Sequence, residues 1–90
     1  MKFMISFRLA PEVRDAALNR FRETQGAPPA GVTMVSRWHP VSGNAGFVLA
    51  DTSDAKALAE WVLRWSDLLS FDVTPVLDDA EVTEVLDRLG

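Results

Sequence analysis

The chain reads VTMVSRWHPVSGNAGFVLA over residues 32–50, and this stretch decides the fold. Two runs of alternating apolar and polar residues flank Ser42-Gly43-Asn44. Glycine and asparagine both tolerate the positive φ angles of a tight turn. The stretch therefore predicts a β-hairpin with arms at residues 32–41 and 45–50.

Strict alternation assigns the side chains of the first arm to two faces of the sheet. One face carries Val32, Met34, Ser36 and Trp38, and the other carries Thr33, Val35, Arg37 and His39. The second arm leaves its faces open, because Phe47 and Leu49 compete with Val48 and Ala50 for the core.

A strand and a helix precede the hairpin. Residues 2–9 alternate, which predicts a strand whose Phe3, Ile5 and Phe7 point toward the core. Pro11 suits the first position of a helix, because the N–H group that it lacks would be unpaired there. The helix is expected to end near residue 24, before a loop that contains two prolines.

A helix, a fourth strand and a last helix follow the hairpin. Side-chain oxygens in residues 51–53 can cap a helix over residues 54–65. Residues 71–77 alternate again, and Pro75 places this strand at a sheet edge, because proline cannot donate to a neighbouring strand. Asp78 and Glu81 have the spacing of a capping box, which starts a last helix.

The order β-α-β-β-α-β with a terminal helix predicts an α+β, ferredoxin-like fold over residues 1–90, as a single domain. Right-handed crossovers then place the two main helices on one face of an antiparallel sheet. The opposite, open face is expected to carry Met4, Ser6, Arg8, Thr33, Val35, Arg37, His39, Asp72, Thr74 and Val76. Such a mixed face is suited to packing against a second copy, so a homodimer is expected.

Composition excludes several classes of function. The chain has 90 residues, a formal net charge of −4 and no cysteine. Without a basic stripe, nucleic acid is not an expected partner, and without thiols there is neither a disulfide nor a cysteine nucleophile. No stretch is long enough to span a bilayer, and the N-terminus lacks a signal peptide, so no membrane association and a cytoplasmic location are expected.

The chain resembles the domain-of-unknown-function family numbered 3303 over nearly its whole length. The resemblance rests on residues 31–32, on Arg37-Trp38-His39 and above all on residues 60–68 leading into 71–76. It implies a subunit of the dimeric α/β-barrel superfamily that packs face to face with a second copy, with no established activity. Other members of that superfamily include cofactor-independent monooxygenases and lactone isomerases.

A few side chains are candidates for a site. His39, the only histidine, is the candidate acid or base. Arg8 and Arg37, placed on one face by alternation, are candidate anchors for an anion, although an ion pair with Asp72 is the competing explanation. Trp38 or Trp61 is a candidate aromatic wall, although tryptophans at helical spacing usually belong to the core. One histidine among scattered carboxylates gives no metal site, and no cofactor is expected.

Two hypotheses about function remain at this point. The first is a non-catalytic module whose open face, with Met4, Val35 and Val76, packs against a second copy. The second is a site for an anionic or aromatic small molecule, with or without catalysis, for which a cavity of roughly 300 Å³ or more is expected.

Overall fold

Four antiparallel strands form one sheet in the computed structural model, which describes all 90 residues. The strands are β1 (Lys2–Arg8), β2 (Thr33–Trp38), β3 (Ala45–Asp51) and β4 (Ser70–Val76), in the spatial order β2-β3-β1-β4. This order is that of the ferredoxin-like arrangement, and it confirms the predicted fold class. β4 lies at an edge, as its proline predicted.

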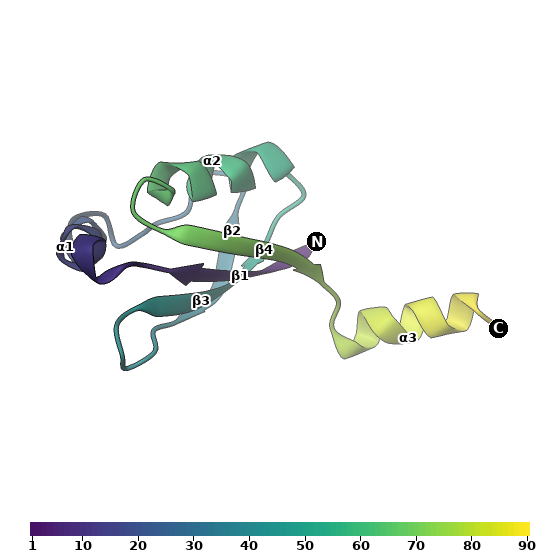
Figure 1. Ribbon diagram of the computed structural model, residues 1–90. Helices are drawn as coiled ribbons and strands as arrows, with labels where there is room; N and C mark the ends of the chain where they lie inside the picture. Colours follow the sequence, from purple (N-terminus) through teal and green to yellow (C-terminus); the bar gives the residue numbers. More distant parts are fainter.

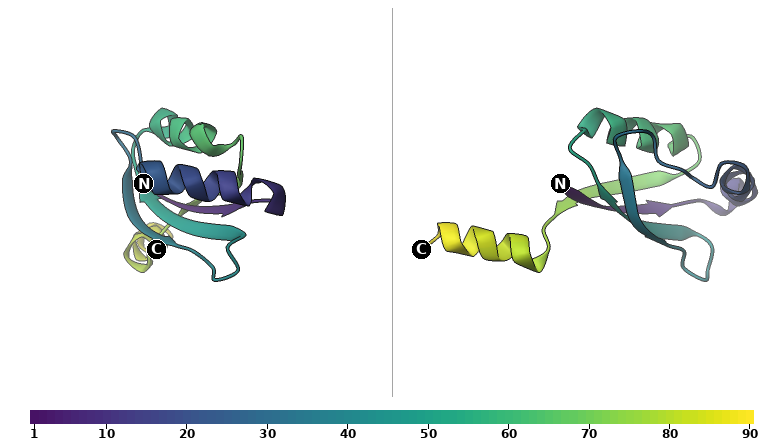
Figure 2. Two further views of the ribbon diagram at one scale, coloured as in Figure 1. Left: turned by 90° about the vertical axis from the view of Figure 1, so that its left-hand side faces the viewer. Right: turned by 180° about the vertical axis from the view of Figure 1, so that it is seen from behind.

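Two of the three helices cover one face of the sheet. A short 3₁₀ turn (Pro11–Val13) leads into α1 (Arg14–Thr24), and α2 is Ala55–Trp65. In the right-hand view of Figure 2, α2 lies above the sheet and α1 lies at one end of it. The last helix, α3 (Asp79–Arg88), projects away from the rest of the chain (Figure 1). None of the helices is long and apolar enough to cross a membrane.

Side-chain alternation in β1 places the core as predicted. Ile5 is 2% exposed, and Phe3 and Phe7 pack against the same buried cluster. In β3 the core residues are Val48 and Ala50, so Phe47 and Leu49 point to the open face. The structure therefore decides between the two assignments that the sequence left open.

A β-bulge in β2 overturns the predicted faces of Arg37 and Trp38. Met34 pairs with Ala50 and Ser36 pairs with Leu49, so Val35 is an extra residue without a partner. Two residues on one strand then oppose one on the other, and alternation reverses beyond that point. Arg37 pairs with the buried Val48 and points to the helical side. Trp38, predicted to face the core, pairs with Phe47 and is 66% exposed on the open face.

Helix caps refine two predicted boundaries. The N-cap of α2 is Asp54, whose carboxylate accepts from the backbone N–H groups of Lys56 and Ala57, rather than a residue within 51–53. The capping box of Asp78 and Glu81 is present as predicted. β2 ends at Trp38, three residues earlier than predicted, two residues before Pro40.

Candidate functional site

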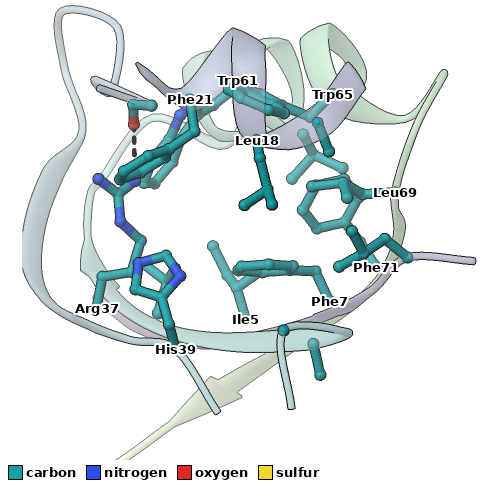
Figure 3. Close-up of a pocket in the computed structure, with 17 residues that line it drawn as sticks. Ile5, Phe7, Leu18, Phe21, Arg37, His39, Trp61, Trp65, Leu69 and Phe71 are labelled. Carbon is teal, nitrogen blue, oxygen red and sulfur yellow. Dashed lines mark hydrogen bonds between the residues drawn. The ribbon is translucent and has the colours of Figure 1, made fainter. Parts of the chain in front are cut away.

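A cavity of about 350 Å³ lies between the two covering helices and the sheet (Figure 3). Of its 17 lining residues, 13 are hydrophobic. The sheet contributes Ile5, Phe7, Val48 and Phe71, α1 contributes Ala17, Leu18 and Phe21, and α2 contributes Trp61, Val62 and Trp65. The cavity is therefore larger than the minimum volume expected for a ligand site. It lies on the covered face of the sheet and not on the open one.

The floor of the cavity depends on a glycine. Phe7 is paired with Gly46 across β1 and β3, and its ring occupies the space that a Cβ atom of residue 46 would need. A Cβ atom on residue 46 would lie 1.9 Å from Cζ of Phe7. The missing side chain lets the ring lie flat on the sheet, which leaves the volume above it free. Sequence analysis did not single out Gly46, although a glycine inside a strand often marks a close approach.

Arg37 forms one wall of the cavity and is held by carbonyl groups. Its guanidinium donates to the backbone oxygens of Gly26, at 2.9 Å, and of Gln25, at 2.7 Å. It also lies over the ring of Phe21, 4.8 Å from the centroid. No carboxylate pairs with it, and its partial burial lowers its pKa. Arg37 is therefore a cation whose charge is balanced only by carbonyl dipoles and a ring.

The turn that follows α1 aims these carbonyls. Gln25 and Gly26 both adopt the left-handed conformation, with φ of 59° and 57°. A Cβ atom at Gly26 would lie 2.7 Å from Nη1 of Arg37, so both the positive φ and the close approach of Arg37 favour a glycine there. The negative end of the α1 dipole faces the guanidinium as well. Arg37 accordingly connects the end of α1 to the sheet.

His39 lies beside Arg37 on the same wall. Its ring meets the ring of Phe21 edge-on, at 5.3 Å between centroids. It follows the last residue of β2, at the mouth of the cavity, and its side chain forms no hydrogen bond within the chain. Both ring nitrogens are free for a ligand or for water.

The remaining predicted site residues are divided between the two faces. Trp61 is buried in the core and also lines the cavity. Arg8 lies on the open face and forms no ion pair, so the predicted convergence of Arg8 and Arg37 is wrong, and so is the predicted pairing with Asp72. Trp38 lies on the open face too, and it cannot be part of the cavity wall.

A second arginine, which the sequence analysis did not identify, joins the two helices at the other end of the cavity. Arg20 donates to both carboxylate oxygens of Asp67, at 2.8 and 2.7 Å, and to the carbonyl of Arg64. It also lies over Trp65, a cavity residue. Arg64 itself pairs with Glu60, one turn earlier on α2.

This arrangement suits binding of a flat, apolar molecule that carries one negative group. Aromatic rings from the sheet and α2 line the cavity, and a single cationic group is placed at one end. Pockets of this composition, mostly apolar with a few placed polar groups, are typical of small-molecule sites.

Topology and cavity together define the class, an α+β protein of ferredoxin-like arrangement with an apolar cavity between helices and sheet. The chain belongs to the family described as a domain of unknown function (DUF3303), whose model matches residues 1–90. The resemblance drawn from the sequence is confirmed at the level of this family. No curated protein and no solved structure matches the chain.

Proposed function

We propose that this protein binds a small aromatic or otherwise apolar monoanion in the cavity between α1, α2 and the sheet. The observation that carries the proposal is Arg37, a cation at the wall of an apolar cavity with no carboxylate partner. A partly desolvated charge is costly unless it is paired, and a ligand anion supplies the missing pair.

The hydrogen bonds of Arg37 leave room for such a ligand. A guanidinium has five N–H donors, and two of them are used by the carbonyls of Gln25 and Gly26. The remaining donors can form a charge-assisted pair with a carboxylate or phenolate. The rings of Phe7, Trp61 and Trp65 line the rest of the space, which fits a compound with one or two aromatic rings.

A comparison of acids with their amides tests the proposal. Benzoate and 1-naphthoate are added to the protein and the shift in melting temperature is measured, with benzamide and 1-naphthamide as neutral analogues of the same shape. We expect the acids to stabilise the wild type more than the amides do. In Arg37→Gln the difference between acid and amide should disappear.

The matched control is Arg8→Gln. This variant loses the same charge from the opposite face of the sheet, where Arg8 has no ion pair, so it should keep the preference for the acids. Each shift is measured against the melting temperature of the same variant without ligand. Equal shifts for acids and amides in the wild type would refute anion recognition, and equal loss in both variants would refute the role of Arg37.

The enzymatic form of this proposal assigns proton transfer to His39. Imidazole is the side chain that changes charge between about pH 5 and 8 and can exchange a proton with a bound ligand. If His39 touches the ligand, His39→Gln should weaken the affinity for 1-naphthoate. An unchanged affinity in the variant would contradict this role. A cytoplasmic setting, expected from the sequence, is part of the same proposal.

A second proposal concerns the open face, which we infer to be a homodimer interface. Trp38, Phe47 and Met4 are exposed there, and Leu49 lies between them on β3. Grouped apolar side chains on one sheet face support association with a second copy. The cavity and the interface use opposite faces, so the two hypotheses drawn from the sequence are compatible.

Light scattering at micromolar concentration tests the dimer. We expect twice the chain mass for the wild type and the single-chain mass for Trp38→Glu. Leu63→Glu is the control, because Leu63 is an equally exposed apolar residue on α2, on the other side of the molecule. A monomeric wild type would refute the proposal.

A further inference from the structure

The last helix has an apolar side that is exposed to solvent. Val82, Val85, Leu86 and Leu89 recur at helical spacing along α3 and are between 40% and 79% exposed. A stripe of this kind normally faces a core. Figures 1 and 2 show α3 standing clear of the sheet and of both covering helices.

Ion pairs from β1 hold the start of α3, and the helix points away from its own sheet. Only Leu77 and Asp78 separate β4 from α3. Nζ of Lys2, on β1, lies 3.3 Å from Asp78 and 3.2 Å from Glu81 in the first turn of the helix. The capping box of Asp78 and Glu81 fixes the start of the helix within α3 itself. The ion pairs of Lys2 connect this first turn to β1.

The dimensions of the chain show how much surface is left without a partner. The accessible surface is 6306 Å², whereas a monomer of 9.9 kDa is expected to expose about 5,200 Å². The surplus of about 1,100 Å² exceeds the roughly 800 Å² that each partner buries in a standard interface. The radius of gyration is 15.0 Å, against about 12 Å for a compact chain of this length.

We propose that α3 is an exchanged arm, whose apolar stripe packs on the open sheet face of a second copy. The exchange is reciprocal in a two-fold dimer, so each copy covers the exposed Trp38 and Val35 of the other with its helix. This inference rests on the proposed homodimer, and it adds that α3 provides a large part of the interface. It does not depend on ligand binding in the cavity.

Sedimentation over a range of protein concentrations tests whether the apolar stripe of α3 stabilises the dimer. Leu86→Glu places a charge in the stripe, and Thr83→Glu places the same charge on the polar side of the same helix. We expect Leu86→Glu to raise the dimer dissociation constant at least tenfold and Thr83→Glu to change it by less than about twofold. Equal constants for wild type and Leu86→Glu would refute the exchanged arm.

A paramagnetic label tests the location of the arm. The chain has no cysteine, so Glu84→Cys on α3 takes a single nitroxide. The protein that carries the nitroxide contains no ¹⁵N, and it is mixed with ¹⁵N protein that carries no nitroxide. Line broadening then reports only contacts between copies. We expect broadening of the amides of Trp38 and Phe47, and none at these amides when the label is at Lys56→Cys on α2.

Each outcome separates this inference from the others. Broadening within one chain, seen when ¹⁵N protein carrying its own label is diluted into excess unlabelled protein, would show α3 on its own sheet and refute exchange. A stable dimer that shows no broadening between copies would refute exchange and leave the proposed interface intact. A monomeric wild type would refute both, and the preference of the cavity for acids would still be measurable.

Discussion

The ring of Phe7 lies across the backbone of Gly46 on the neighbouring strand, where a Cβ atom would be 1.9 Å from Cζ of the ring. A methyl group at residue 46 must therefore push the ring into the cavity. For Gly46→Ala we expect a loss of about 1–3 kcal/mol in the free energy of unfolding, typical of overpacking, measured by urea denaturation.

A double-mutant cycle shows whether that ring is the cause. In the background of Phe7→Leu the methyl group has more room, so the same Gly46→Ala change should cost at least about 1 kcal/mol less. Equal costs in the two backgrounds would contradict the contact. Gly46→Ala should also weaken binding of 1-naphthoate, because the displaced ring fills part of the cavity.

Arg37 contributes to stability through the end of α1. Removal of its side chain leaves two carbonyls without a donor and removes the contact with Phe21. We expect Arg37→Ala to lower the free energy of unfolding by about 1–2 kcal/mol, since hydrogen bonds from charged groups are among the stronger ones. Arg8→Ala, which removes an exposed arginine without an ion pair, should change it by less than about 0.5 kcal/mol. Equal effects of the two substitutions would contradict the assignment.

The ion pair between Arg20 and Asp67 predicts that the free energy of unfolding decreases at low pH. The hydrogen bonds from Arg20 lower the pKa of Asp67 below its ordinary value of 3.8. The carboxylate therefore stabilises the fold fully above that value, and this contribution is lost as the pH falls through the lower, folded-state pKa. Wild type should be more stable than Asp67→Asn at pH 6, and the difference should shrink toward zero below pH 3.8.

Urea denaturation from pH 6 to pH 2 measures this difference. Glu23→Gln is the control, because Glu23 is an exposed carboxylate on α1 that forms no ion pair. Its difference from wild type should be small at pH 6. A gap between wild type and Asp67→Asn that stays constant with pH would contradict the linkage.

The register of β2 predicts the result of deleting Val35. Because Val35 is the extra residue, its removal leaves Met34, Ser36, Arg37 and Trp38 on the faces that they already occupy. We expect the deletion variant to fold, to lose less stability than Arg37→Ala and to keep its preference for aromatic acids. Loss of that preference in a folded variant would show that Arg37 had moved to the other face.

Most of the fold could be predicted, because its signals are local. Alternation in β1, the turn at residues 42–44, Pro75 at the edge and the capping box before α3 each depend on neighbours in sequence, and each is found in the structure. The faces of β3 could not be predicted, because both sets of its residues are apolar. They are decided by pairing with β1, which is a contact between distant residues.

The candidate site was predicted only in part, for a related reason. Arg37, His39 and Trp61 were identified by residue type, and all three line the cavity. The placement of Arg37 and His39 on the covered face was not predicted. One extra residue reverses the alternation, and valine is an ordinary strand residue that does not signal a bulge at position 35. Gly46 and Arg20 act through partners 39 and 47 positions away, Phe7 and Asp67, and no local pattern signals such contacts.

Arg37 and Trp38 share a peptide bond, yet the bulge before them sends one side chain inward and the other outward. A single layer of backbone therefore separates the proposed ligand site from the proposed interface between copies. Substitutions on one face of the sheet are expected to leave the other face unchanged, within a chain of only 90 residues.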